Sequence, residues 1–243
     1  MSPKRRVAVV AGIFAALGIG VSLAIIAIGG GFCPGCPTIV NPPGPEDIWV
    51  VGSNIHDGIA LEYSLTSMGT VSSLDSADVS MIFRESGDNW NVTFAVTNGT
   101  SPEFIDTITM SKGLTREGHI DESFVPYLEP IQSSIFAVRD MEYGDRDKYL
   151  VVGAPWNTIF YKASQVTVRV TAEEKIQTPA GTFDAFVLSY ELGDRMSKIW
   201  MVSNLPLPAK AEVYDTDDNL QYRFELLDVS GVDPTVTPTD SAS

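Results

Sequence analysis

The stretch Val166–Glu173, VTVRVTAE, places an apolar side chain at every second position. Polar side chains fill the positions between, at Thr167, Arg169, Thr171 and Glu173. A period of two is typical of a β-strand that buries one face and exposes the other to water. The stretch therefore predicts a half-buried strand, which needs neighbouring strands of the same period to complete a sheet.

The same alternation recurs along much of the chain. It is found at residues 59–65, 79–83, 90–96, 182–190, 197–202, 211–214 and 220–226. Turn-forming sequences separate several of these segments, such as TPAG at Thr178–Gly181 and DTDDN at Asp215–Asn219. Closely spaced strands of this kind form antiparallel meanders. The fold is therefore predicted to be mainly β.

The C-terminal third carries a resemblance to a known family. The run QTPAGTFDAFVLSY, then KIWMV, then NLPLPAKAEVYDTDDNLQYRFELLDV is similar to the last strands of lipoprotein-carrier (LolA-like) half-barrel domains of the cell envelope. The resemblance covers Val166 to Val229. It implies a strongly curved antiparallel half-barrel sheet, with one or two helices plugging a concave face that in carrier members receives acyl chains. A β-sandwich is the alternative arrangement of the strands.

The matching residues are turn formers and core aromatics, so the resemblance assigns no catalytic position. The residues read as structural are Pro179, Gly181, Phe183, Trp200, Pro206 and Pro208.

One segment outside the N-terminal region has a helical period. Apolar residues within Asp121–Asp140 recur at spacings of three and four, at Phe124, Leu128, Ile131, Ile135 and Val138. Because Pro126 and Pro130 break the entry, the helix is expected to start near Glu129, with Pro130 in its first turn. This apolar face would plug the sheet or line a cavity beneath it.

The N-terminal region predicts a membrane anchor. Residues 1–6 form a basic cap, and Val7 to Phe32 contains no charged residue. A helix of this length measures about 39 Å, which is enough to cross a hydrocarbon core of about 30 Å. The basic cap places the N-terminus in the cytoplasm and the rest of the chain outside. The alternative is a cleaved signal peptide and a secreted domain.

Three further segments follow the anchor. Residues 33–47 form a Cys/Pro-rich linker, whose Cys33 and Cys36 are expected to form a disulfide, within one chain or between chains. Residues 48–229 form the β-rich extracytoplasmic domain, and residues 230–243 form a disordered tail rich in Ser, Thr and Pro.

The charge of the chain limits its partners. Without the three basic residues of the cap, 13 Lys and Arg face 31 Asp and Glu, a formal charge of −18. Nucleic acid is therefore excluded as a partner, and an anionic membrane surface would repel the domain. Two sequons, at Asn91 and Asn98, are candidate glycosylation sites.

No catalytic, cofactor or metal site is predicted. The chain lacks the G-x-S-x-G, H-E-x-x-H and phosphate-loop motifs. His119, with Asp121 and Ser123 nearby, has the residue types of a catalytic triad, but nothing in the positions of these residues indicates one. Asp215, Asp217 and Asn219 imitate the start of an EF-hand loop, but Leu220 stands where that loop needs glycine. A hairpin turn is preferred for this segment.

Three functions remain open from the sequence. The leading hypothesis is a membrane-anchored extracytoplasmic binding module for an apolar, lipid-like ligand or an envelope partner. The alternative is a structural or assembly protein of the cell envelope that fills its cavity with its own helix. An exported enzyme comes third, and it would need carboxylates converging on His56 or His119.

Overall fold

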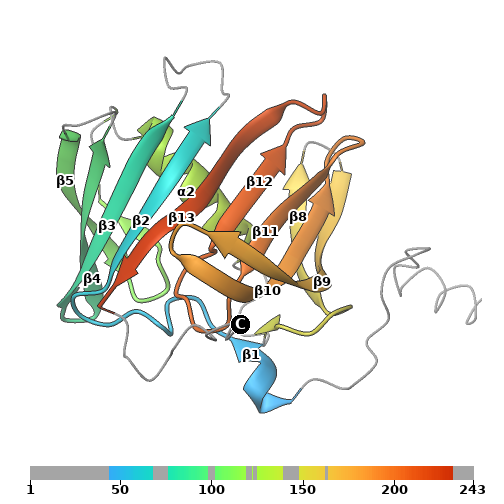
Figure 1. Ribbon diagram of the computed structural model, residues 1–243, viewed down its shortest axis with the longest axis horizontal. Helices are drawn as coiled ribbons and strands as arrows, with labels where there is room; N and C mark the ends of the chain where they lie inside the picture. Colours follow the sequence, from blue (N-terminus) through green and yellow to red (C-terminus); the bar gives the residue numbers. More distant parts are fainter. Residues whose placement is uncertain are drawn as a thin grey trace, which may run out of the picture. The chain divides into compact units, whose positions relative to one another are not determined.

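An antiparallel sheet of eleven strands makes up most of the described chain (Figure 1). The computed structural model describes residues 44–67, 76–97, 102–118, 122, 125–138, 148–161 and 164–231. The eleven strands are β2 (Ala60–Ser67), β3 (Ala77–Ser86), β4 (Asn89–Thr97), β5 (Pro102–Ser111), β6 (Arg116–Glu117), β8 (Pro155–Tyr161), β9 (Ser164–Thr178), β10 (Gly181–Glu191), β11 (Met196–Met201), β12 (Lys210–Tyr214) and β13 (Leu220–Ser230). The prediction of a mainly β protein is thus confirmed.

The strand order shows how the sheet is built. It runs β6-β5-β4-β3-β2-β13-β12-β11-β10-β9-β8, and every pairing is antiparallel. Two meanders of consecutive strands therefore meet where β2 pairs with β13. These strands form one continuous sheet, whereas a sandwich would divide them between two sheets. A short 3-10 turn, η1 (Pro45–Asp47), precedes a separate ribbon of β1 (Ile48–Trp49) and β7 (Lys148–Tyr149).

Alternation along each strand decides which face is buried. In β4, Trp90, Val92, Phe94 and Val96 are buried, and the residues between them are partly exposed. The register places residues of the same phase from β2, β3 and β13 beside them. One face of the sheet is therefore apolar across both meanders.

Helix α2 (Val125–Val138) packs on this apolar face, where it contacts β2, β8 and β13. The predicted start near Glu129 is wrong, because the helix begins at Val125 and encloses Pro130. Pro126 fits the first turn, where a backbone N–H needs no helical partner. Pro130 then removes only the bond to the Pro126 carbonyl, a loss that the packing of the helix on the sheet offsets.

The sheet bends back at its β9–β10 end. The backbone N–H of Ala180, in the turn between these strands, donates to the carbonyl of Leu226 in β13 (3.4 Å), although β11 and β12 separate β10 from β13. The bend buries a second group of side chains on the face opposite α2, namely Ile176, Phe183, Val187 and Trp200. The indole N–H of Trp200 donates to the Glu174 carboxylate.

The predicted membrane anchor lies outside the described part of the chain. None of the helices in the described residues is long and apolar enough to span a bilayer. Val7 to Phe32, residues 33–43 of the predicted linker 33–47 and residues 232–243 of the predicted tail 230–243 fall on residues that the structure does not describe. Of the rest, Pro45–Asp47 form η1, and Ser230 is the last residue of β13.

Candidate binding site

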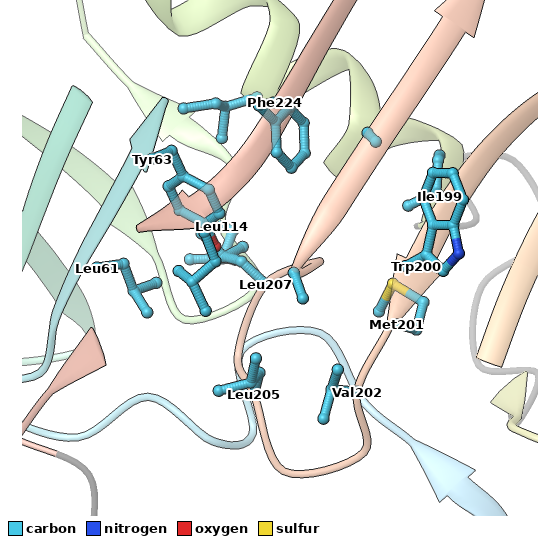
Figure 2. Packing of buried hydrophobic residues seen from close by; sticks show 14 of the residues in the cluster. Leu61, Tyr63, Leu114, Ile199, Trp200, Met201, Val202, Leu205, Leu207 and Phe224 are labelled. Carbon is cyan, nitrogen blue, oxygen red and sulfur yellow. The ribbon is translucent and has the colours of Figure 1, made fainter. Parts of the chain in front are cut away.

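The candidate site is the layer between α2 and the apolar face of β2 and β13 (Figure 2). Aromatic rings dominate its sheet side. The rings of Tyr63 and Phe224 meet edge to face with centroids 5.3 Å apart, and Tyr222 stacks parallel to Phe224 at 6.3 Å. On the helix side, Leu128 and Ile131 are 1% and 2% exposed. The layer is therefore apolar and aromatic, as in pockets that hold apolar ligands.

Tyr63 places a polar atom without a partner in this layer. The residue is 1% exposed, and its hydroxyl has no hydrogen-bond partner among the described residues. Burial raises the pKa of the phenol, so the group stays neutral at any physiological pH. An unpaired buried hydroxyl costs about 1–3 kcal/mol. The Tyr63 hydroxyl therefore lowers the stability of the folded domain at a position within the candidate site.

Tyr190 and its strand partner Ser197 lie farther along the same face. The hydroxyl of Tyr190 hydrogen-bonds to Ser197, and burial raises the pKa of Tyr190 to about 12. Burial also raises the pKa of Tyr222, and the nearby Tyr190 raises it further. The Ser197 hydroxyl accepts the backbone N–H of Tyr214 (3.1 Å). The hydroxyls of Tyr190 and Ser197 are thus paired, in contrast to the hydroxyl of Tyr63.

The loop between β11 and β12 closes the other end of the layer. Its Leu205 and Leu207 are buried and belong to the same apolar cluster as Leu61 and Leu114 (Figure 2). The amide of Asn54 fixes the loop by donating to the Ser203 carbonyl (3.0 Å). The sequence identified this LPLP segment only as a turn. Its alternating leucines were the available signal that it also contributes to the core.

The predicted site residues have different outcomes. Leu128 and Ile131 lie in the layer beneath α2, as the helical period predicts. Asn91 lies on β4, on the face opposite the layer. The remaining predictions fall outside the described residues or side chains, and these are Cys33, Cys36, Asn98, Phe124, Ile135 and Val138. Sequence reasoning placed Tyr63, Tyr222 and Phe224 in strands without assigning them to a site.

In the acidic turn between β12 and β13, the Asp215 carboxylate accepts hydrogen bonds from within the turn itself. Asp215 Oδ1 accepts the backbone N–H groups of Asp217 (2.8 Å) and Asn219 (2.9 Å), which makes a closed hairpin turn. Asp218 Oδ1 accepts the N–H groups of Asp194 and Arg195 in the neighbouring loop. No group of three metal-ligating side chains occurs among the described residues. The hairpin reading of this segment is confirmed.

These hydrogen bonds predict an acid-sensitive stability. The N–H of Asn219 lowers the pKa of Asp215, and the N–H of Glu85 lowers that of Asp57. A lowered pKa in the folded state stabilises the fold above the unfolded pKa and is lost as the pH falls through the folded value. We expect the urea midpoint to fall between about pH 4 and pH 2, and Asp215→Asn to reduce this fall.

Tryptophan fluorescence in urea series at several pH values measures this effect. Asp228→Asn is the matched control, since Asp228 is exposed on β13 and no described hydrogen bond reaches its carboxylate. Equal acid sensitivity of Asp215→Asn and the unmodified chain would contradict the assignment.

The histidine that the structure describes lies on the surface. His56 contacts the carbonyl of Gly231 at the end of β13. Next to it, Asp57 accepts the Glu85 N–H (2.9 Å) and pairs with Arg84 (3.3 Å). Asp57 therefore serves to hold its loop on β3. His119, Asp121 and Ser123 lie outside the described residues.

Comparisons with known proteins give only distant structural similarities. No protein-family model matches the chain, and no curated protein matches it. A predicted lipoprotein of Parabacteroides distasonis is similar in fold at a TM-score of 0.36 and 13% identity, covering 76% of this chain and 99% of that one. A predicted exported protein of Bacteroides fragilis with a YmcC-like fold gives 0.33 and 13%, with shares of 76% and 99%.

MucB of Pseudomonas aeruginosa, in its complex with MucA, is a third similar structure. The TM-score is 0.40 at 12% identity, and the match covers 74% of this chain. The match takes in 54% of the MucB chain, so the present chain spans about half of that protein's length. At these identities and TM-scores the similarities carry no inference about the site.

Proposed function

We propose that this chain is a membrane-anchored extracytoplasmic binding module whose ligand is an apolar, lipid-like molecule with a polar group. The sheet acts as a half-barrel, and the ligand occupies the layer between α2 and the face formed by β2 and β13. Val7 to Phe32 holds the module at the membrane, so the ligand is bound at the cell surface and not carried away from it.

The observation that carries the proposal is the unpaired hydroxyl of Tyr63. A protein that needed only a packed core at this position would gain stability from phenylalanine, because an orphaned hydroxyl is costly. The hydroxyl is useful if a ligand atom pairs with it. The surrounding rings of Phe224 and Tyr222 supply apolar contact for the remainder of such a ligand.

Binding requires a rearrangement of α2. Tyr63 is buried, and Leu128 and Ile131 of α2 belong to the same buried cluster. A ligand therefore takes the volume that these two side chains fill. Pro130 leaves one helical hydrogen bond of α2 unmade, which lowers the cost of moving its first turns.

Tyr63→Phe tests the proposal. We expect this variant to raise the free energy of unfolding of the ligand-free domain by roughly 1–2 kcal/mol, because it removes the orphaned hydroxyl. Native mass spectrometry of the domain, purified from its own host and released from the membrane, should show a bound lipid-sized mass. The occupied fraction should fall in Tyr63→Phe.

Tyr190→Phe is the matched control. This variant also removes one buried phenol oxygen, but this oxygen is hydrogen-bonded to Ser197. The variant should therefore lose a little stability and keep its ligand. An empty unmodified domain would refute lipid binding. A bound peptide or protein mass would instead point to a segment of an envelope partner.

The dense packing beneath α2 favours a second candidate function. Leu128 and Ile131 are almost completely buried, so the helix itself fills the layer in this structure. A structural or assembly protein of the cell envelope would need nothing more. If Tyr63→Phe is stabilised and the purified domain is always empty, this second function is the one to pursue.

A further inference from the structure

The solvent face of the first meander carries a modification motif that the proposed function does not use. Asn91-Val92-Thr93 lies in the middle of β4. The side chain of Val92 is buried on the α2 face, so Asn91 and Thr93 both project from the opposite face. Each of them is partly exposed.

The neighbours of Asn91 on this face leave its amide nitrogen available. Its strand partners are Arg84 on β3 and Thr109 on β5. The Thr109 hydroxyl donates to Asn91 Oδ1 (3.4 Å), while no described group accepts from Nδ2. The adjoining cross-strand pair is Thr93 and Thr107. Around Asn91 this face therefore carries several threonine hydroxyls, and no element of the described residues covers it.

We propose that Asn91 is N-glycosylated and that the sugar lies on this face, on the side of the sheet away from α2. In the transfer, Asn91 Nδ2 attacks the anomeric carbon of a lipid-linked oligosaccharide supplied by the host. The bond from this carbon to the phosphate oxygen breaks, the lipid phosphate leaves with the electron pair, and a proton of Nδ2 passes to the transferase. The hydroxyls of Thr93 and Thr109 then offer hydrogen bonds to the first sugar.

The strand pairing also sets the order of events. β4 is paired on both sides, by β3 and β5, and Val92 points into the core. A transferase that must enclose the tripeptide has no access to it in the finished sheet. The sugar is therefore added while the chain is being exported, before β4 joins its neighbours.

Mass spectrometry of the full chain from its own host tests the proposal. Trypsin leaves both sequons on one peptide, Glu85 to Lys112, so cleavage after Trp90, Phe94 and Phe104 is needed to separate them. We expect a hexose-containing mass on the fragment Asn91–Phe94. An unmodified Asn91 in this material overturns the proposal.

Two substitutions separate the motif from the fold. Thr93→Val keeps a β-branched side chain and removes the sequon hydroxyl, so the modified fraction should fall more than tenfold. Thr107→Val removes the facing hydroxyl on β5 and leaves the sequon intact, so the modified fraction should stay within twofold. An equal loss in both variants would show a folding effect and overturn the assignment.

The order of events has its own test. Host membranes containing the transferase and its lipid-linked donor should modify a synthetic peptide of residues 87–97 and leave the folded, bacterially produced chain unmodified. Modification of the folded chain at Asn91 would overturn the proposed order.

Discussion

Phe224→Ala should lower the free energy of unfolding by roughly 3–5 kcal/mol, which is the usual cost of deleting a buried ring. Phe224 is 2% exposed and lies between Tyr63 and Tyr222 in the layer beneath α2. Its loss removes two ring contacts and opens a cavity that the neighbouring strands cannot fill, because each is hydrogen-bonded on both sides. Urea denaturation followed by tryptophan fluorescence measures the change.

The neighbouring residue supplies the control for this substitution. Arg223 is exposed on the opposite face of β13, so Arg223→Ala should change the free energy of unfolding by less than about 0.5 kcal/mol. If Phe224→Ala cost less than about 1 kcal/mol, the aromatic layer would not be closely packed, and the role assigned to the Tyr63 hydroxyl would lose its basis.

Gly52→Ala is expected to destabilise the domain by roughly 3 kcal/mol. Gly52 has a φ of 78°, and a Cβ on it would lie 2.4 Å from the backbone oxygen of Lys112. The substitution therefore adds left-handed backbone strain to a clash that only a backbone shift can relieve. The clash would push the loop at residues 51–58 off the turn between β5 and β6.

Gly87 separates these two costs. It has a φ of 61° in the turn between β3 and β4, and a Cβ there would meet nothing within 4 Å. Gly87→Ala should cost only about 1 kcal/mol, for the backbone strain alone. The difference between the two variants, from urea midpoints, measures the clash. Equal costs would show that the loop moves away from Lys112 freely.

The alternation of apolar and polar residues predicted most of the strands. It failed for strands in which this alternation is interrupted. The sequence did not predict β5 or β8. In β5 the exposed Ile105 puts an apolar residue on the solvent face, which breaks the alternation with Ile108 and Met110. The apolar residues of β8, PWNTIFY, do not alternate. A pattern of side chains identifies a strand only when one face is consistently polar.

The candidate site was only partly predictable, for a different reason. Helical spacing identified Leu128 and Ile131, because their burial is a local property of one element. The unpaired hydroxyl of Tyr63 depends on what other elements place around it. Its partner strand β13 lies roughly 160 residues away in the chain, and local sequence carries no signal for such a pairing. Tyr63 was therefore predictable as a strand residue and not as a site.

The pairing of β2 with β13 also determines how the domain can fold as it emerges. Each meander can grow hairpin by hairpin, but the seam between them closes only when the last strand arrives. Until then both strands have an unpaired edge, and the apolar face remains open. Closure is a late, non-local step, so the domain should fold slowly and need protection from aggregation during export.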